Sequence, residues 1–132
     1  MLVEAAETLP STIRVLVVDD EPLFVEMVRA MLAPEEGIEV VGTGGDGLSA
    51  VRLAEELDPD VIVMDVSMPV MDGIDATKRI RDADPGACVL ILTGGTAAGD
   101  VDRARKAGAS AYITKDRIST DLVSEIRNLA GR

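Results

Sequence analysis

Five short, largely apolar runs recur along this 132-residue chain, and each is followed by a stretch in which apolar residues are spaced as on a helix. The runs are Ile13–Val18, Ile38–Val41, Val61–Met64, Cys88–Leu92 and Ala109–Ile113. They read as continuous apolar blocks rather than as an alternation of apolar and polar residues, which is typical of parallel strands covered by helices on both faces. The pattern therefore predicts five strand–helix units in succession.

The stretches between the runs carry the signals of helix starts and ends. Pro22 suits a first helical turn, where its missing N–H has no partner to lose, and Asp46 is a suitable capping residue for the second helix. The third stretch ends at Asp84-Pro85-Gly86. The fourth, Ala98–Ala107, is the weakest, because Val101 is its only sizeable apolar side chain. We expect a helix after every strand, with the fourth helix the most poorly anchored.

Right-handed crossovers allow either an open doubly wound sheet or part of a barrel. Five units are too few for an eight-stranded barrel. We therefore expect an α/β fold of flavodoxin-like type, with a five-stranded parallel sheet in the order 2-1-3-4-5. The domain should span residues 13–130, preceded by a flexible tail over residues 1–12.

The tail contains Glu4, Glu7 and Pro10 but no basic residue, so it does not fit a signal peptide. The longest apolar runs are far shorter than the roughly 18 residues that a membrane-spanning helix needs. These features favour a cytoplasmic protein without a membrane partner.

Composition excludes several classes of function. The chain has 24 acidic and 13 basic side chains, and its net charge of −11 disfavours direct binding of nucleic acid or anionic lipid. It contains no histidine, so Ser-His-Asp catalysis, histidine-ligated zinc and a phosphohistidine-donor role are excluded. The single cysteine, Cys88, rules out an internal disulfide. Because it lies in an apolar run, we expect a buried, inert thiol.

Ligands of doubly wound sheets bind at the carboxyl ends of the strands. In this chain the first strand ends at Asp19-Asp20-Glu21, the third at Asp65, the fourth at Thr93 and the fifth near Lys115. Crowded carboxylates need a neutralising cation, and Mg²⁺ favours carboxylate, carbonyl and phosphate oxygens. The lysine and the threonine suit phosphoryl oxygens. With no cysteine or histidine at a strand end, the nucleophile ionised at pH 7 is a carboxylate.

Taken together, these residues resemble the receiver domain of bacterial two-component response regulators. The resemblance covers about Ile13 to Leu129. It rests on motifs in a fixed order: Val17-Val18-Asp19-Asp20-Glu21, Met64-Asp65-Val66-Ser67-Met68-Pro69-Val70-Met71-Asp72-Gly73, Leu92-Thr93, Ala107-Gly108-Ala109, Tyr112 and Lys115.

The resemblance implies a phosphoacceptor and a metal site. Asp65 would accept a phosphoryl group from the phosphohistidine of a sensor histidine kinase. Asp20, Asp65 and the backbone carbonyl of Ser67 would bind Mg²⁺ (or Mn²⁺), and Asp19 would act through water. The domain would catalyse its own phosphorylation and dephosphorylation without being an enzyme toward other substrates.

It also implies a conformational switch. Lys115 would pair with the phosphoryl group, Thr93 would move toward it, and Tyr112 would rotate inward. The face made by the fourth helix, fifth strand and fifth helix would then change for an output domain, a downstream protein or a phosphorylation-dependent homodimer. The glycine-rich segment 94–99 predicts a loose loop, and we hypothesise that phosphorylation orders it.

The Lys115-Asp116 pair is similar to the subclass with a LuxR-type helix-turn-helix output. That similarity favours transcriptional control through a DNA-binding domain outside this chain. A stand-alone receiver acting by protein contact remains an alternative. With no proline after Lys115, the peptide bond there can be cis or trans.

Two other classes of function stay open at this point. Gly42, Gly44 and Gly47 form a G-x-G-x-x-G pattern, with Asp65 some twenty residues on, as in a dinucleotide-binding fingerprint. Asp46 would place a negative charge beside the pyrophosphate of NAD, which counts against this alternative. A haloacid-dehalogenase-like phosphatase also uses Asp, Thr, Lys and Mg²⁺, but that family has Asp-x-Asp on its first strand, whereas Asp19 and Asp20 are adjacent.

A purely structural role is the alternative for Asp19-Asp20-Glu21. These residues would then form a helix N-terminus, where their carboxylates oppose the helix dipole.

Overall fold

The computed structural model describes residues 12–94 and 98–131. Five parallel strands form one sheet in the order β2-β1-β3-β4-β5, which confirms the predicted fold. The strands are β1 (Ile13–Val18), β2 (Ile38–Gly44), β3 (Val61–Asp65), β4 (Val89–Thr93) and β5 (Ala111–Thr114).

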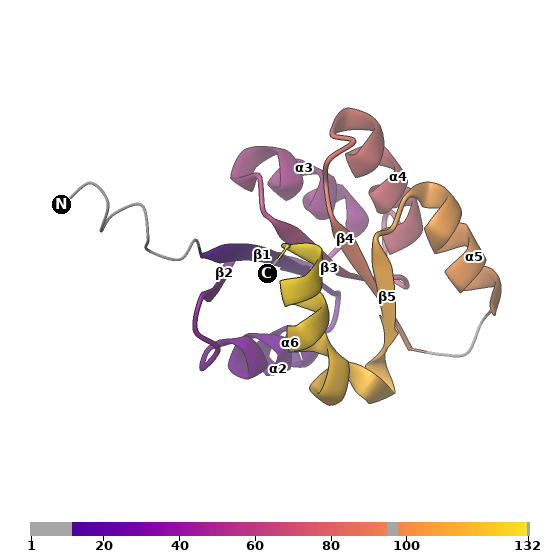
Figure 1. Cartoon of the computed structure of the whole chain (residues 1–132). Coiled ribbons are helices and arrows are strands. Elements are labelled where there is room, and N and C mark those ends of the chain that lie inside the picture. The colour runs from indigo at the N-terminus through magenta and orange to yellow at the C-terminus, as the bar shows by residue number, and fades with distance from the viewer. Residues whose placement is uncertain (1–11, 95–97, 132) are drawn as a thin grey trace, which may run out of the picture.

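The helices are α2 (Pro22–Leu32), α3 (Gly47–Leu57), α4 (Gly73–Ala83), α5 (Ala98–Ala107) and α6 (Ile118–Leu129), with a short 3-10 helix, η1 (Lys115–Arg117), before the last. Helices α2 and α6 pack on one face of the sheet, and α3, α4 and α5 pack on the other (Figure 1). Because both faces are covered, the central strands β1, β3 and β4 are almost wholly buried. In the described ranges, no helix combines the length and the apolar character needed to cross a membrane.

The local signals at the helix starts act as predicted. Pro22 occupies the first turn of α2. Asp46 caps α3, since its Oδ1 accepts a hydrogen bond from the Ser49 N–H at 2.7 Å. Asp72 caps α4 in the same way, with its Oδ1 2.8 Å from the Asp75 nitrogen. No cis peptide bond occurs among the described residues, so the bond after Lys115 is trans.

Two strand boundaries were predicted too early. Gly108 has a φ of +103° and ends α5, and the Ala109 N–H bonds back to the Ala104 carbonyl, so β5 begins only at Ala111. Cys88 precedes β4 and is half-buried, with its Sγ 3.8 Å from the Leu129 carbonyl oxygen. The prediction of a buried strand cysteine was therefore wrong. Residues 1–11 and 95–97, which include most of the predicted tail and part of the predicted loose loop, lie outside the described residues.

The glycines of the dinucleotide-like pattern allow close packing between neighbouring elements. Gly42 and Gly44 lie within β2 at the edge of the sheet. A Cβ on Gly42 would lie 2.6 Å from the Leu57 side chain, and one on Gly47 would lie 2.3 Å from the Met71 carbonyl oxygen. These close approaches account for the glycines without a bound nucleotide. The packing therefore offers no support for the NAD alternative.

Replacing Gly47 with alanine should destabilise the domain, because the new methyl group would collide with the backbone of Met71. We expect a loss of about 2 kcal/mol in the free energy of unfolding, as for other overpacked sites. Gly45→Ala is the matched control, since nothing lies within 4 Å of its Cβ position. Urea unfolding measures both variants, and equal stabilities would contradict the packing argument.

Candidate functional site

The carboxyl ends of β1, β3 and β5 bring an acidic cluster and one lysine together. Asp19 and Asp20 directly follow β1, Asp65 is the last residue of β3, and Lys115 follows β5. One oxygen from each of the three carboxylates lies within 4.8 Å of the other two. The structure thus gathers residues that are up to 96 positions apart in the sequence.

Lys115 links the two buried carboxylates. Its Nζ lies 3.0 Å from Asp19 Oδ2 and 3.3 Å from Asp65 Oδ1. The same ammonium lies 4.2 Å from the centroid of the Phe24 ring, which comes from α2. A cation above an aromatic face is attracted to the negative potential of the ring. Phe24 therefore holds Lys115 over the cluster, a role that sequence reasoning missed, although it is the only phenylalanine in the chain.

Burial and backbone contacts fix the positions of the carboxylates. Asp19 is 2% exposed, and its Oδ1 accepts a hydrogen bond from the Glu21 N–H at 2.9 Å. Asp65 is 6% exposed. A Cβ on Gly73 would lie 2.0 Å from the Asp65 carbonyl oxygen, so this glycine allows α4 to start against the end of β3. Asp20 is exposed and makes no ion pair with any described residue.

The negative charge of the cluster is only partly compensated by Lys115. Burial raises the pKa of Asp65, the charge of Asp19 raises it further, and Lys115 offsets only part of this effect. Burial lowers the pKa of Lys115, but its hydrogen bonds and the charges of Asp19 and Asp65 outweigh that effect, so the net direction is upward. Lys115 therefore stays protonated, while ionised Asp65 is under-compensated.

This donor set fits a hard divalent cation. Three carboxylates and one ammonium leave two negative charges uncompensated, and carboxylate oxygens are the ligands that Mg²⁺ favours. Ser67 is exposed and lines, together with Asp20, an open hollow of about 540 Å³ beside the cluster. A cation and a phosphoryl group thus have access from solvent on this side.

The other two predicted residues lie on neighbouring strands. Thr93 ends β4 and is 5% exposed, in register with Thr114 at the end of β5. Tyr112 lies on β5 and is 47% exposed, so its ring is turned outward in this conformation.

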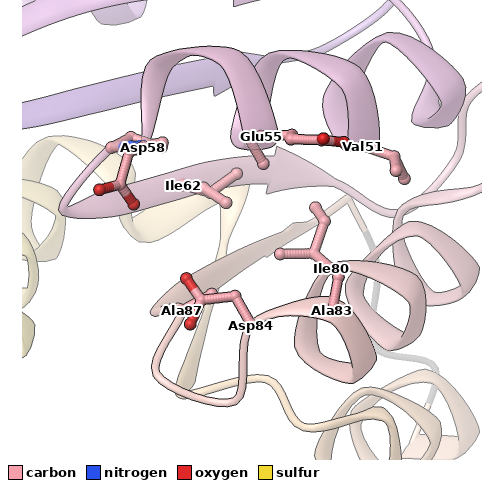
Figure 2. A pocket seen from close by; sticks show the side chains of 10 residues that line it. Val51, Glu55, Asp58, Ile62, Ile80, Ala83, Asp84 and Ala87 are labelled. Atoms are coloured by element: carbon pink, nitrogen blue, oxygen red, sulfur yellow. The ribbon is translucent and has the colours of Figure 1, made fainter.

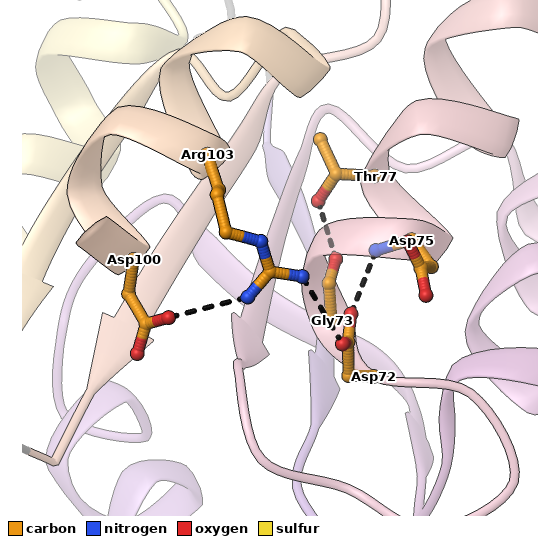
Figure 3. Close-up of polar contacts among 6 residues, drawn as sticks. All are labelled: Asp72, Gly73, Asp75, Thr77, Asp100 and Arg103. Carbon is orange, nitrogen blue, oxygen red and sulfur yellow. Dashed lines mark hydrogen bonds and ion pairs between the residues drawn. The ribbon is translucent and has the colours of Figure 1, made fainter. Parts of the chain in front are cut away.

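Arg103 connects α5 to the loop that follows Asp65. Its Nη2 lies 3.5 Å from Asp72 Oδ2, and its Nη1 lies 3.3 Å from Asp100 Oδ1 (Figure 3). The same Asp72 caps α4, and the Thr77 hydroxyl donates to the Gly73 carbonyl one turn further on. Arg103 also lines the hollow beside the cluster. The sequence suggested no specific partner for this arginine.

The loop between β3 and α4 contains a strained residue. Val70 has a φ of +70°, and the Met71 N–H bonds to the Pro69 carbonyl at 2.7 Å, which closes a γ-turn. A positive φ is unfavourable for a β-branched side chain. Val70 is 77% exposed, so no packing of its side chain explains this conformation.

These geometric features agree with the comparisons to known proteins. A family model described as the response regulator receiver domain matches residues 15–127. The chain belongs to this family.

Solved receiver domains share the fold closely. The signal receiver domain of NarL from Mycobacterium tuberculosis aligns with a TM-score of 0.88 at 33% identity, over 92% of this chain and 98% of that one. A LuxR-family two-component response regulator from Aurantimonas sp. SI85-9A1 aligns with a TM-score of 0.87 at 40% identity, over 92% and 88% of the two chains.

Curated relatives include transcriptional regulators. PdtaR, a transcriptional regulatory protein from Mycobacterium tuberculosis, is 44% identical over 119 residues, which cover 90% of this chain and 57% of PdtaR. The nitrate/nitrite response regulator NarP of Escherichia coli is 41% identical over 114 residues, which cover 86% of this chain and 53% of NarP. The chain thus spans between half and three fifths of the length of these two relatives.

Replacing Asp65 with asparagine should stabilise the metal-free domain at pH 7. A raised carboxyl pKa means that the folded state disfavours the charged form, so the wild type loses stability as the pH rises above the ordinary value of 3.8. The advantage of the variant should therefore be largest at neutral pH and shrink as the pH falls through the raised pKa. Urea unfolding in EDTA at several pH values measures the difference.

Asp82→Asn is the control for this comparison, because Asp82 forms only an exposed ion pair with Lys78. Its effect on the free energy of unfolding should be small. An Asp65→Asn variant that is less stable than the wild type at pH 7 would show that Lys115 already compensates the charge.

Proposed function

We propose that this domain is the phosphoacceptor of a two-component phosphorelay and that Asp65 accepts the phosphoryl group. The observation that carries the proposal is the meeting of Asp19, Asp20, Asp65 and Lys115 at the carboxyl ends of β1, β3 and β5. Membership of the receiver family supports it. The domain acts on itself and is not an enzyme toward other substrates.

In the proposed reaction, a carboxylate oxygen of Asp65 attacks the phosphorus of a phosphohistidine on a sensor histidine kinase. An O–P bond forms as the N–P bond breaks, and the histidine takes up a proton and leaves as neutral imidazole. Lys115, which contacts Asp65 directly in the unphosphorylated structure, binds one oxygen of the transferred group. The Thr93 hydroxyl donates to another oxygen.

The acidic cluster also supports a cation site. Mg²⁺ or Mn²⁺ held by Asp20, Asp65 and the Ser67 carbonyl, with Asp19 through water, would supply positive charge to the phosphoryl oxygens. Asp65 would thus share its oxygens between the cation and the phosphorus. Asp19 keeps Lys115 in place through their 3.0 Å ion pair.

We further propose that phosphorylation changes the face formed by α5, β5 and α6. Movement of Thr93 toward the phosphoryl group and inward rotation of the exposed Tyr112 would alter this face. The conformation that best holds the phosphoryl group is then favoured by its differential binding energy.

Transcriptional control is the best-supported output of the proposed switch. The relative PdtaR is named as a transcriptional regulatory protein, and one structural neighbour belongs to the LuxR family. DNA contact would belong to a domain outside this chain, in keeping with its net charge of −11. A homodimer formed on phosphorylation through the α5–β5–α6 face is compatible with this output. A cytoplasmic location of the reaction is part of this proposal.

Phosphoryl uptake tests the proposal. Incubation with acetyl phosphate and MgCl₂ should add one phosphoryl group to the wild type, measured by intact-protein mass spectrometry. Asp65→Asn should abolish the uptake, because the amide is not a nucleophile at neutral pH. Asp82→Asn, which removes an exposed carboxylate of α4, should retain it. Full uptake by Asp65→Asn would refute the assignment.

Metal binding is tested separately by stability. Free Mg²⁺ at 100 times its Kd should stabilise the wild type by about 2.7 kcal/mol, since it binds the folded state only. Asp20→Asn should remove most of this gain, because it deletes the exposed, unpaired carboxylate of the cluster. Lys115→Ala should retain the gain while impairing the switch. Thermal unfolding with and without MgCl₂ distinguishes these outcomes, and an unchanged Mg²⁺ response in Asp20→Asn would exclude this residue as a ligand.

A further inference from the structure

A groove of about 370 Å³ lies between α3 and α4, at the ends of β3 and β4 opposite to the acidic cluster (Figure 2). We call it the α3–α4 groove. Its inner side is apolar, formed by side chains that include the almost wholly buried Ile62 and Ile80. Apolar floors of this kind accept aliphatic side chains of a ligand.

The groove exists because the side chains along its walls are short. Ala54 on α3, Ala83 on α4 and Ala87 before β4 all line it. At the other end of the same two helices, the Gly47 N–H donates to the Met71 carbonyl at 3.0 Å, which locks α3 against the start of α4. The opening is therefore built into the fold between well-anchored elements.

The rim of the α3–α4 groove is acidic. Glu55, Asp58 and Asp84 line it, and no basic residue from the described part of the chain does. Among the described residues, the carboxylates of Glu55 and Asp58 have no ion-pair partner. The Asp84 carboxylate accepts a hydrogen bond from the Gly86 N–H at 3.0 Å and forms no ion pair with a described residue. Asp58 and Asp84 lie at the same end of the groove in Figure 2.

Two basic residues, one on each helix, pair with carboxylates outside the groove. Arg52 pairs with Glu56 at 3.8 Å, and Lys78 pairs with Asp82 at 3.2 Å. The three groove carboxylates are thus left available to a cation from outside the chain.

Two helix ends add to the negative potential. Asp58 is the C-cap of α3 and Asp84 the C-cap of α4, and the C-terminus of a helix carries a partial negative charge. Arg14 bonds to the Leu57 and Asp58 carbonyls, and Arg81 to the Pro85 and Ala87 carbonyls, so each satisfies backbone groups. Neither guanidinium lies within ion-pair distance of the groove carboxylates.

We infer that the α3–α4 groove binds a basic, amphipathic peptide segment of another protein. One or two aliphatic side chains of the segment enter the groove, and flanking lysines or arginines meet Glu55, Asp58 and Asp84. Two other occupants match the charge poorly. Residues 1–12 of this chain contain Glu4 and Glu7 and no basic residue, and a second copy carries the same net charge of −11. The inference does not rest on phosphorylation of Asp65, because the groove lies at the other end of the strands.

An NMR titration tests the inference with a defined probe. The probe is the synthetic peptide acetyl-Lys-Leu-Lys-Leu-Leu-Lys-amide, added to ¹⁵N-labelled wild-type protein. Amide shifts should cluster around the α3–α4 groove, and binding should weaken as NaCl is added. Shifts centred on Asp19, Asp20 and Asp65 would overturn the inference.

Matched charge variants separate the groove from the overall charge. Glu55→Gln/Asp58→Asn should weaken binding about tenfold by removing two screened ion pairs with the probe. Asparagine suits position 58, where φ is +47°. Glu56→Gln/Asp82→Asn removes the same formal charge outside the groove and should change the affinity less than about twofold. Equal effects of the two double variants would contradict the inference.

The apolar part of the inference has its own test. Ala83→Phe fills the groove without changing the charge, and it should also weaken binding of the probe. A peptide with serine in place of every leucine should bind more weakly than the probe, and a peptide with glutamate in place of every lysine should not bind. Equal binding by either control peptide would overturn the inference.

Discussion

Uncompensated negative charge at the carboxyl ends of the strands is the constraint on which the site depends. Asp19, Asp20 and Asp65 crowd together, and within residues 12–94 and 98–131 Lys115 is the only ammonium in contact with the two buried carboxylates. Burial strengthens their mutual repulsion, which the raised pKa of Asp65 reflects. A bound metal cation would reduce this repulsion, and transfer of a phosphoryl group to Asp65 would change the net charge of the cluster again. The same imbalance would account for both the metal binding and the switching that we propose.

The doubly wound sheet holds these carboxylates close together despite their repulsion. Its buried strands fix the backbone of Asp19 and Asp65, while Gly73 allows α4 to begin against the Asp65 carbonyl. Arg103 then ties α5 to the capping residue Asp72 in the loop that follows Asp65. The loop that follows Asp65 is thus in direct contact with α5, which forms part of the face that we propose for output. The strained backbone at Val70 lies in the same loop.

Much of the fold and of the cluster could be predicted, because both follow from local patterns. Continuous apolar runs identify parallel strands, and strand ends in a doubly wound sheet converge. Contacts made by long side chains could not be predicted, since they depend on packing between distant elements. Phe24 under Lys115 and Arg103 beside Asp72 are of this kind. The late start of β5 was missed because the turn at Gly108 uses the Ala109 N–H to close α5. The α3–α4 groove arises from alanines that carry no pattern of their own.

The central claim is that one carboxylate of the cluster, Asp65, is the nucleophile. Sodium borohydride reduces an aspartyl phosphate to homoserine, so it marks the phosphorylated residue permanently. The domain would be phosphorylated with acetyl phosphate and Mg²⁺, reduced, digested and sequenced by tandem mass spectrometry. The account predicts homoserine at position 65 and unmodified aspartate at positions 19 and 20. Homoserine at position 19 or 20, with position 65 unmodified, would contradict it.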